Sequence, residues 1–384
     1  MNRDEKEFAY WLLSIPGIGE KTIRLLLSRF KRPGKVYTAS EAELSECLKG
    51  MQLTHVLERQ RNWNLKEEYE KLDIKGIGVV FYGEKTYPKR LLEIPDAPYA
   101  LFYRGSLPKE EALSVAVIGA RECSGYGEFV AAQLGRYLGE QGIQVISGMA
   151  RGIDGISQTA AMEAGGTSYG VLGSGVDVCY PKSNHRLYDR LIKQGGVLSA
   201  YVPGALPASG HFPPRNRIVS GLADALVVVE ARGKSGTLIT VDMALEQGKE
   251  VFVVPGRITD RLSDGCNRLL TQGAGVFLTP ADFVSQLREL AAKKGIAETD
   301  DGESKNEDEI KETVIEKQKK QNLLSVSKEL RPVYKQLEIS PKTIEQILCK
   351  MPAGYHQGLV SAALMRLCMD GYAKQVSPGQ FVLS

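Results

Sequence analysis

Five short apolar runs recur between residues 114 and 260, and a glycine-rich turn follows each of them. The runs occupy residues 115–118, 145–146, 169–172, 226–229 and 251–254. Uninterrupted β-branched runs that alternate with helical segments are typical of a parallel sheet covered by helices on both faces. We therefore expect an α/β domain over residues 114–290, with a parallel sheet at its centre.

The turns after these runs combine glycine with arginine or lysine. They lie at residues 119–121, 148–152, 173–175 leading to Lys182, 232–237 and 255–257. The carboxyl ends of parallel strands share one edge of a sheet, so all five turns are expected there. Glycine lets backbone N–H groups approach an anion, and arginine adds paired hydrogen bonds, so the pattern predicts a crevice for several phosphates. In the alternative, the glycines only close tight turns and the arginines face solvent.

Composition describes a globular protein without an obvious catalytic or metal centre. The 384 residues are 43% hydrophobic and 25% charged, with a net charge of +3, which permits a polyanionic partner. The four histidines show no metal-ligand spacing, and we expect neither a metal nor another cofactor. We interpret the scattered cysteines as buried thiols of a reducing cytoplasm: they are Cys47, Cys123, Cys179, Cys266, Cys349 and Cys368. No apolar stretch approaches membrane-spanning length, so we expect a cytoplasmic protein without a signal peptide or membrane span.

Helical periodicity marks residues 1–75 as a separate domain. Apolar positions recur at helical spacing on both sides of residues 15–19, a Gly-containing turn followed by Lys21. This arrangement is typical of a helix-hairpin-helix (SAM-like) element, in which a helix start binds one phosphate of a nucleic-acid backbone. The alternative is a turn that only joins two packed helices. Residues 76–113 are expected to connect this domain to the sheet.

A third domain is predicted at residues 332–384, after a charged linker at 291–331. Residues 298–312 contain eight acids and two lysines, too polar for a core. Beyond the linker, we expect a helix that starts at Ser340 and Pro341, a second helix ended by Gly371, and a hairpin of residues 372–376 and 380–383. Helices followed by two strands describe a winged helix. Such a module docks on DNA or on protein, and Arg366 is the one strong cation of its second helix.

The motifs, taken in order, resemble the DNA-processing protein A family, also called DprA or Smf. The resemblance covers most of the chain and is carried by residues 119–121 (GAR), 147–154 (SGMARGID), 180–184 (YPKSN), 212–218 (FPPRNRI), 235–240 (SGTLIT) and 254–256 (VPG). It implies an extended Rossmann-like sheet, a homodimer formed through that domain, and a protein that binds single-stranded DNA. It further implies loading of the RecA recombinase against single-strand-binding protein, in recombination and in the natural transformation of competent bacteria. Gln158 and Ala200 depart from the family pattern.

The resemblance also implies a set of DNA-binding residues. Carried over by position, Arg121, Lys182, Arg215 and Arg217 line the DNA pocket. The predicted DNA-binding set further comprises Gly119, Arg151, Asn216, Lys234, Ser235, Gly236 and Thr237. Tyr126, Tyr180 and Phe212 are candidates for stacking on bases, with core packing as the alternative. Residues 266–270 are expected to form a helix near the last strands that either supplies the dimer surface or covers the sheet.

Enzyme alternatives fit the sequence less well. Residues 233–237 resemble the phosphate loop of phosphoribohydrolases, which place a glutamate shortly after the threonine, but here the first acid is Asp242. A P-loop would need glycine at Val228, and a dinucleotide-binding GxGxxG is missing after the first run. Asp154 is a candidate base, or else it caps a helix by accepting N–H groups near Ser157. We therefore expect a binding protein, with a nucleotide-binding or phosphoribohydrolase-like enzyme and a recombinase-docking scaffold as alternatives.

Overall fold

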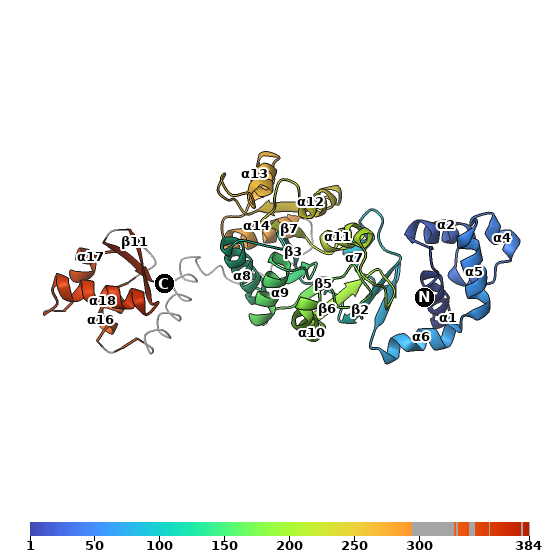
Figure 1. The fold of residues 1–384 in the computed structure, drawn as a ribbon, viewed down its shortest axis with the longest axis horizontal. Coiled ribbons are helices and arrows are strands. Elements are labelled where there is room, and N and C mark those ends of the chain that lie inside the picture. Colours follow the sequence, from blue (N-terminus) through green and yellow to red (C-terminus); the bar gives the residue numbers. More distant parts are fainter. Residues whose placement is uncertain (294–325, 328, 338–341, 353, 378, 384) are drawn as a thin grey trace. The chain divides into compact units, whose positions relative to one another are not determined.

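The computed structural model describes residues 1–293, 326–327, 329–337, 342–352, 354–377 and 379–383. The chain folds into two compact units, Met1–Glu298 and Thr299–Ser384 (Figure 1). Most of the charged linker predicted at residues 291–331 lies outside the described residues, but residues 291–293 end the helix Pro280–Lys293 and Val326 is buried in the core of the second unit. The finer division into domains stays a prediction.

A nine-stranded sheet forms the centre of the first unit, with the strand order β1-β2-β6-β5-β4-β3-β7-β8-β9. Its strands are β1 (Gly78–Phe81), β2 (Ala100–Gly105), β3 (Ser114–Ile118), β4 (Gln144–Ser147), β5 (Ser168–Val171), β6 (Gly195–Ser199), β7 (Ala225–Val228), β8 (Glu250–Val253) and β9 (Gly275–Val276). From β6 to β9 all neighbours pair in parallel. The five predicted runs are confirmed as β3, β4, β5, β7 and β8.

The sheet begins earlier than expected, because the segment expected to connect two domains supplies strands β1 and β2. Strand β1 pairs antiparallel with β2, and β2 pairs antiparallel with β6. A buried ion pair anchors this segment to the sheet: Arg90 Nε lies 2.9 Å from Asp224 Oδ1, and Asp224 also accepts the Ser114 N–H at 2.8 Å. Each of the two buried charges thus has an opposite charge beside it next to β3. Residues 76–113 therefore belong to the sheet and its core and do not form a separate connecting segment.

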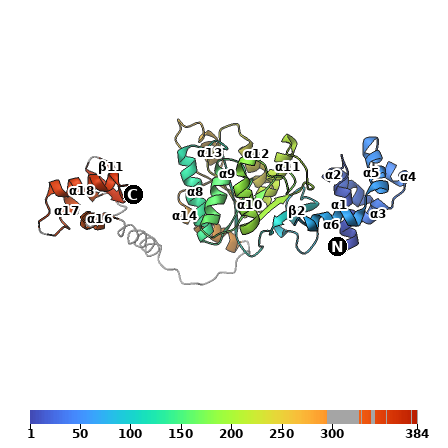
Figure 2. The same cartoon turned by 60° about the horizontal axis from the view of Figure 1, so that its bottom comes forward.

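Helices cover both faces of the sheet (Figures 1 and 2). Alternate residues of β3 enter two different cores, since side chains along a strand point to opposite faces. Val115 and Val117 join the core beneath α8 (Gly125–Glu140), α9 (Ile153–Glu163) and α14 (Pro280–Lys293). Ala116 and Ile118 join the core beneath α7 (Lys89–Leu92), α11 (Phe212–Gly221), α12 (Gly236–Glu246) and α13 (Asp264–Thr271). A third core lies beneath α10 (His185–Gln194).

Helices α8 and α9 approach each other closely because α8 presents two glycines to its neighbour. A Cβ atom at Gly135 would lie 2.2 Å from the carbonyl oxygen of Ser157, and one at Gly139 would lie 2.3 Å from that of Ala161. Any larger side chain would push the helices apart. This contact fixes α9, whose first turn carries Asp154.

Six helices occupy the N-terminal part of the unit. They are α1 (Arg3–Leu13), α2 (Glu20–Phe30), α3 (Pro33–Tyr37), α4 (Glu41–Ser45), α5 (Met51–Asn62) and α6 (Leu65–Ile74). The Gly-containing turn between α1 and α2 is held from one side, since Gln52 Nε2 donates to the Gly17 carbonyl at 2.8 Å. Pro16 and Gly17 are exposed. A phosphate contact at this turn stays a prediction.

The second unit contains a three-stranded antiparallel sheet in the order β10-β12-β11, together with three described helices. They are α16 (Arg331–Gln336), β10 (Lys342–Thr343), α17 (Ile344–Leu348), α18 (Gln357–Met369), β11 (Ala373–Ser377) and β12 (Gln380–Leu383). The predicted hairpin is confirmed. The predicted helix start was wrong: residues 342–343 form a strand, and Thr343 caps α17 in a capping box with Gln346.

The close approach of α8 and α9 leads to a first prediction. Gly135→Ala should lower the free energy of unfolding by about 1–3 kcal/mol, because the added methyl group overpacks the backbone of α9. Gly125→Ala is the matched control in the same helix, with open space around its Cβ position. It should be neutral or stabilising by at most about 1 kcal/mol. Urea unfolding of both variants checks this, and equal stabilities would contradict the assigned close approach.

Candidate nucleic-acid interface

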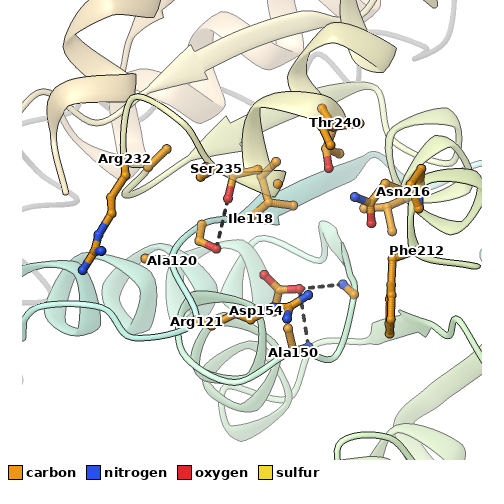
Figure 3. A pocket seen from close by; sticks show the side chains of 18 of the residues that line it. Ile118, Ala120, Arg121, Ala150, Asp154, Phe212, Asn216, Arg232, Ser235 and Thr240 are labelled. Carbon is orange, nitrogen blue, oxygen red and sulfur yellow. Dashed lines mark hydrogen bonds between the residues drawn. The ribbon is translucent and has the colours of Figure 1, made fainter. Parts of the chain in front are cut away.

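A cavity of about 550 Å³ opens at the carboxyl edge of the sheet, where the predicted glycine turns meet. It is lined by the turns after β3, β4 and β7 and by the first residues of α11 and α12 (Figure 3). A second cavity of about 250 Å³ shares Arg121, Phe212 and Arg215 with the first and continues it to Tyr180, beyond β5. The two cavities therefore form one crevice across several neighbouring strand ends.

Two opposite charges meet at Gly148 on the floor of the crevice. Asp154 Oδ2 accepts the N–H groups of Gly148 at 3.0 Å and of Ala150 at 3.4 Å. Arg215 Nη1 donates to the carbonyls of Gly148 at 2.5 Å and of Val171 at 2.8 Å. A Cβ atom at Gly148 would lie 2.1 Å from that same Nη1, so both side chains reach the backbone only because residue 148 is glycine.

Burial acts in opposite directions on the two charges. Desolvation raises the pKa of Asp154, while the nearby Arg215 charge and the backbone N–H groups oppose the rise. Desolvation likewise lowers the pKa of Arg215, and Asp154 opposes that shift. Each charge is thus tolerated in the interior because the other lies near it. Together they tie the turns after β4 and β5 to α11.

The role predicted for Asp154 as a cap needs a correction. Gly152, with φ of 72°, is the residue before α9, and Asp154 lies inside the first turn. Its carboxylate points back to Gly148 and Ala150 (Figure 3), not forward to N–H groups near Ser157. The glycine-rich turn folds over the helix start and offers its own N–H groups first. Asp154 is only 7% exposed and its carboxylate is already hydrogen-bonded, a poor arrangement for a general base.

Exposed cations surround the crevice at the turns of neighbouring strands. Arg121 follows β3, Arg151 follows β4, and Lys182 follows β5. Arg232, which was not among the predicted DNA-binding residues, follows β7 and lines the larger cavity. None of these four forms an ion pair within the described part of the chain.

The turn that carries Lys182 is fixed to its neighbour. Asn184 Nδ2 donates to the carbonyls of Met149 and Ala150, both at 3.0 Å. This pair of bonds joins the turn after β5 to the turn after β4, so Lys182 and Arg151 are carried by one connected backbone. Asn184 is the last residue of the YPKSN motif, but the motif alone does not indicate that its side chain joins the two turns.

The remaining predicted residues divide into two groups. Gly119, Asn216, Ser235, Gly236 and Thr237 line the larger cavity, and Thr237 Oγ1 donates to the Gly119 carbonyl at 3.4 Å. Arg217 points elsewhere and pairs with Glu246 at 3.3 Å, because one side of α11 faces the crevice and the other faces α12. Lys234 is exposed beside the cavity without lining it.

Aromatic rings add apolar surface to the crevice. Phe212 lines both cavities, and its ring centroid lies 5.9 Å from that of Tyr180. The guanidinium carbon of Arg121 lies 5.9 Å from the centroid of the Phe212 ring. Tyr180 is 44% exposed, which argues against the core-packing alternative for this ring.

Other predicted features differ in placement. Asp242, the acid considered for an enzyme, is exposed on α12 and lines none of the cavities described above. Of the cysteines expected to be buried, Cys266 is buried, Cys349 is exposed and the others are intermediate. No cluster of metal-ligating side chains occurs among the described residues. None of the described helices is long and apolar enough to cross a membrane.

The burial of Arg215 leads to a second prediction. Arg215→Ala should lower the free energy of unfolding by about 3–5 kcal/mol, because it leaves Asp154 buried near no opposite charge. Arg217→Ala, two residues along the same helix, should change it by at most about 1 kcal/mol, since its ion pair is partly exposed. Denaturant unfolding of both proteins distinguishes the roles. An Arg215→Ala protein as stable as the parent would contradict the structural role.

Comparison with known proteins agrees with this geometry. Residues 78–288 match the family model of DNA recombination-mediator protein A. The DNA processing protein DprA of Streptococcus pneumoniae is 44% identical over 203 residues, which cover 53% of this chain and 72% of that protein. The Smf protein of Synechocystis is 31% identical over 290 residues, 73% of each chain.

Two solved structures show the same fold. The crystal structure of DprA from Streptococcus pneumoniae has a TM-score of 0.64 and 33% identity, covering 73% of this chain and 97% of that one. DNA processing protein A from Helicobacter pylori has a TM-score of 0.51 and 30% identity, covering 56% and 96%. The residues matched by the family model include all the turns of the crevice. The chain therefore belongs to the DprA/Smf family of DNA recombination-mediator proteins.

Proposed function

We propose that this protein binds single-stranded DNA in the crevice and promotes loading of a RecA-type recombinase onto that DNA. The observation that carries the proposal is the row of exposed cations at the ends of adjacent strands, which form no ion pair with any residue that the structure describes. The Helicobacter pylori protein described above was solved for its single-stranded DNA binding mode. Competition with single-strand-binding protein and a role in natural transformation belong to the same proposal.

Single strands suit this crevice better than duplex does. A cation that stays exposed and unpaired beside other cations costs repulsion unless an anion joins it, and a nucleic-acid backbone supplies one phosphate after another. Unstacked bases also offer faces to Phe212 and Tyr180, and such stacking tolerates any sequence. In a duplex those faces are covered.

The same geometry favours binding over catalysis. The two acids considered as a base are not placed to act as one or to hold a metal, because Asp154 is committed to Gly148 and Ala150 and Asp242 lies outside the crevice. The other acid of the larger cavity's lining, Glu122, is exposed. We therefore propose a cytoplasmic, cofactor-free binding protein. Turnover of ATP or of nucleoside monophosphates would favour the enzyme alternative instead.

The flanking regions extend the proposal. We infer a helix-hairpin-helix domain at residues 1–75, a sheet domain at 114–290 that also takes in strands β1 and β2, and a winged helix at 332–384. Exposed Pro16 and Gly17 beside the start of α2 support a phosphate contact in the first. Helices α17 and α18 followed by the β11–β12 hairpin support the third.

A homodimer formed through the sheet domain completes the proposal. On the helix expected to supply the dimer surface, Cys266 and Leu269 are buried in the core and cover the sheet. Exposed apolar side chains lie on and just after the edge strand β9 instead: Val276 is 43% exposed and Leu278 70%. Apolar side chains gathered at an edge strand favour an interface.

The crevice leads to a third prediction, on DNA affinity. Arg121→Glu and Lys182→Glu should each weaken binding of a single-stranded oligonucleotide and leave the melting temperature nearly unchanged. Each lost phosphate contact should lower the slope of log affinity against log salt by roughly 0.7. Fluorescence anisotropy at several salt concentrations, with matching duplex in parallel, measures both quantities.

Arg217→Glu serves as the control for charge reversal, because Arg217 faces Glu246 rather than the crevice. It should bind the oligonucleotide with nearly the parental salt slope. The proposed site is excluded if Arg121→Glu and Lys182→Glu also keep the parental affinity.

The exposed edge leads to a fourth prediction, on assembly. Residues 1–293 alone should form a concentration-dependent dimer, and Leu278→Glu should shift it toward monomer by placing a charge in the interface. Ile74→Glu is the control, since Ile74 is 84% exposed on α6, away from the edge strand. Sedimentation velocity over a range of concentrations reads the result. A strictly monomeric parent fragment would rule out dimerisation through this domain.

A further inference from the structure

A third cavity, of about 470 Å³, lies beyond the last cation of the crevice, at the turn after β8. Tyr126, Arg257 and Ser263 are among the residues that line it, with Pro255, Gly256 and Asp260. Strand β8 is the neighbour of β7, whose turn lines the main crevice. The two turns are joined directly, because the Ala231 N–H donates to the Leu262 carbonyl at 2.8 Å. The third cavity is thus the next position along the same edge of the sheet.

Tyr126 presents its ring to solvent while its hydroxyl is held. The hydroxyl donates to the Pro255 carbonyl at 3.3 Å, yet the residue is 49% exposed. Phe129, one helical turn further along α8, is 63% exposed. A large ring gains little by facing water, so two exposed rings on one face of a helix favour a ligand with an apolar surface.

The surroundings of Tyr126 are rigid. The start of α8 is fixed by Ser124, whose N–H donates to Glu230 Oε2 at 2.9 Å and whose hydroxyl bonds Oε1 of the same buried carboxylate. On the opposite wall, the Asn267 side chain accepts the Gly256 N–H at 3.2 Å and donates to the Gly256 carbonyl at 3.1 Å. A preorganised site loses little entropy when a ligand binds.

Charge at this cavity matches a nucleic-acid backbone. Arg257 is exposed, and no ion pair involves it among the described residues. Asp260, the one acid of the lining, uses its carboxylate to accept the Leu262 N–H at 3.0 Å and so shapes the turn. The cations at the turns after β5, β4, β3, β7 and β8 thereby follow the order of the sheet, with a spacing of roughly 4.8 Å between neighbouring strands.

We propose that the third cavity is a base-stacking subsite, in which Tyr126 stacks on a base of the bound single strand and Arg257 contacts its phosphate. This inference rests on the proposed function and extends it: the strand runs from Lys182 across the crevice to β8. The ligand is a nucleobase of any sequence, since stacking needs a flat π-surface and no particular hydrogen bonds.

Oligothymidylates of increasing length, from roughly 4 to 16 nucleotides, test the subsite in the full-length protein. Tyr126→Ala should bind the shortest strands as the parent does and the longer ones about 5- to 150-fold more weakly, the loss of one stacked base. Tyr126→Phe keeps the ring and should retain nearly parental affinity at every length. Arg257→Gln should lower the salt slope for long strands by roughly 0.7. Long strands that carry 5-iodouracil should also cross-link to Tyr126 on irradiation.

The outcomes separate this inference from the proposed function. If Arg121→Glu abolishes binding while Tyr126→Ala and Arg257→Gln match the parent at all lengths, the strand does not reach the subsite and the inference is overturned. Equal losses in Tyr126→Ala and Tyr126→Phe would overturn stacking, because the hydroxyl bond to Pro255 would then carry the effect. A parent protein that binds no single-stranded oligonucleotide would overturn both proposals.

Discussion

The approach of two buried opposite charges to one glycine is the constraint on which the crevice depends. Asp154 holds the N–H side of the turn after β4, and Arg215 holds the carbonyl of Gly148. Neither charge is stable alone in the interior, because burial shifts the pKa of each toward its neutral form. The turn is therefore defined by a pair of interactions that persist only together. Arg215 also binds the Val171 carbonyl, so the ends of β4 and β5 are fixed relative to each other.

This buried arrangement explains how exposed cations can be held close together. Like charges at neighbouring strand ends repel, and nothing in their own contacts among the described residues compensates for it. The rigid turns beneath them supply the compensation. Asn184 fixes the turn of Lys182 to Met149 and Ala150, and Ala231 fixes the turn after β8 to that after β7. The free energy of folding thus maintains a charged edge, and the proposed binding of a nucleic-acid strand would reduce the repulsion between these cations.

Much of the sheet could be predicted from sequence, and the reason is local. Each of the five predicted runs is buried on both faces of the sheet and therefore lacks polar positions. Such a strand can be recognised from its own residues, without knowledge of the strands with which it pairs. Strand β6 was not predicted because it begins with Gly195 and Gly196, which break the apolar pattern. Glycine is needed there, since the Cβ positions of the two residues are filled by the backbones of Ser168 and Ser106. Strands β1 and β2 were not predicted because they join the sheet through the pairing of β2 with β6, a strand roughly a hundred residues later in the chain.

The sequence predicted which residues gather at the site better than it predicted where their side chains point. The spacing of Arg215 and Arg217 on α11 suggests two equivalent cations, yet a difference of two residues rotates them to different faces of a helix. One enters the floor of the crevice, and the other pairs with Glu246. Likewise Asp154 follows a glycine at a helix start, where local chemistry favours capping, but the fold brings the turn at Gly148 back over it.

These differences follow a common physical rule. Sequence patterns report which groups are polar, whereas burial decides whether a polar group serves the fold or meets a ligand. Arg215 and Arg121 occupy similar family motifs and line the same cavity, but one is 5% exposed with two carbonyl partners and the other faces solvent with none. Through Nη1 the buried guanidinium of Arg215 positions the turns, whereas the solvent-facing guanidinium of Arg121 is the one available to a ligand. In a crevice built from backbone turns, the cations that are strongly bonded to the protein are the ones least able to bind DNA.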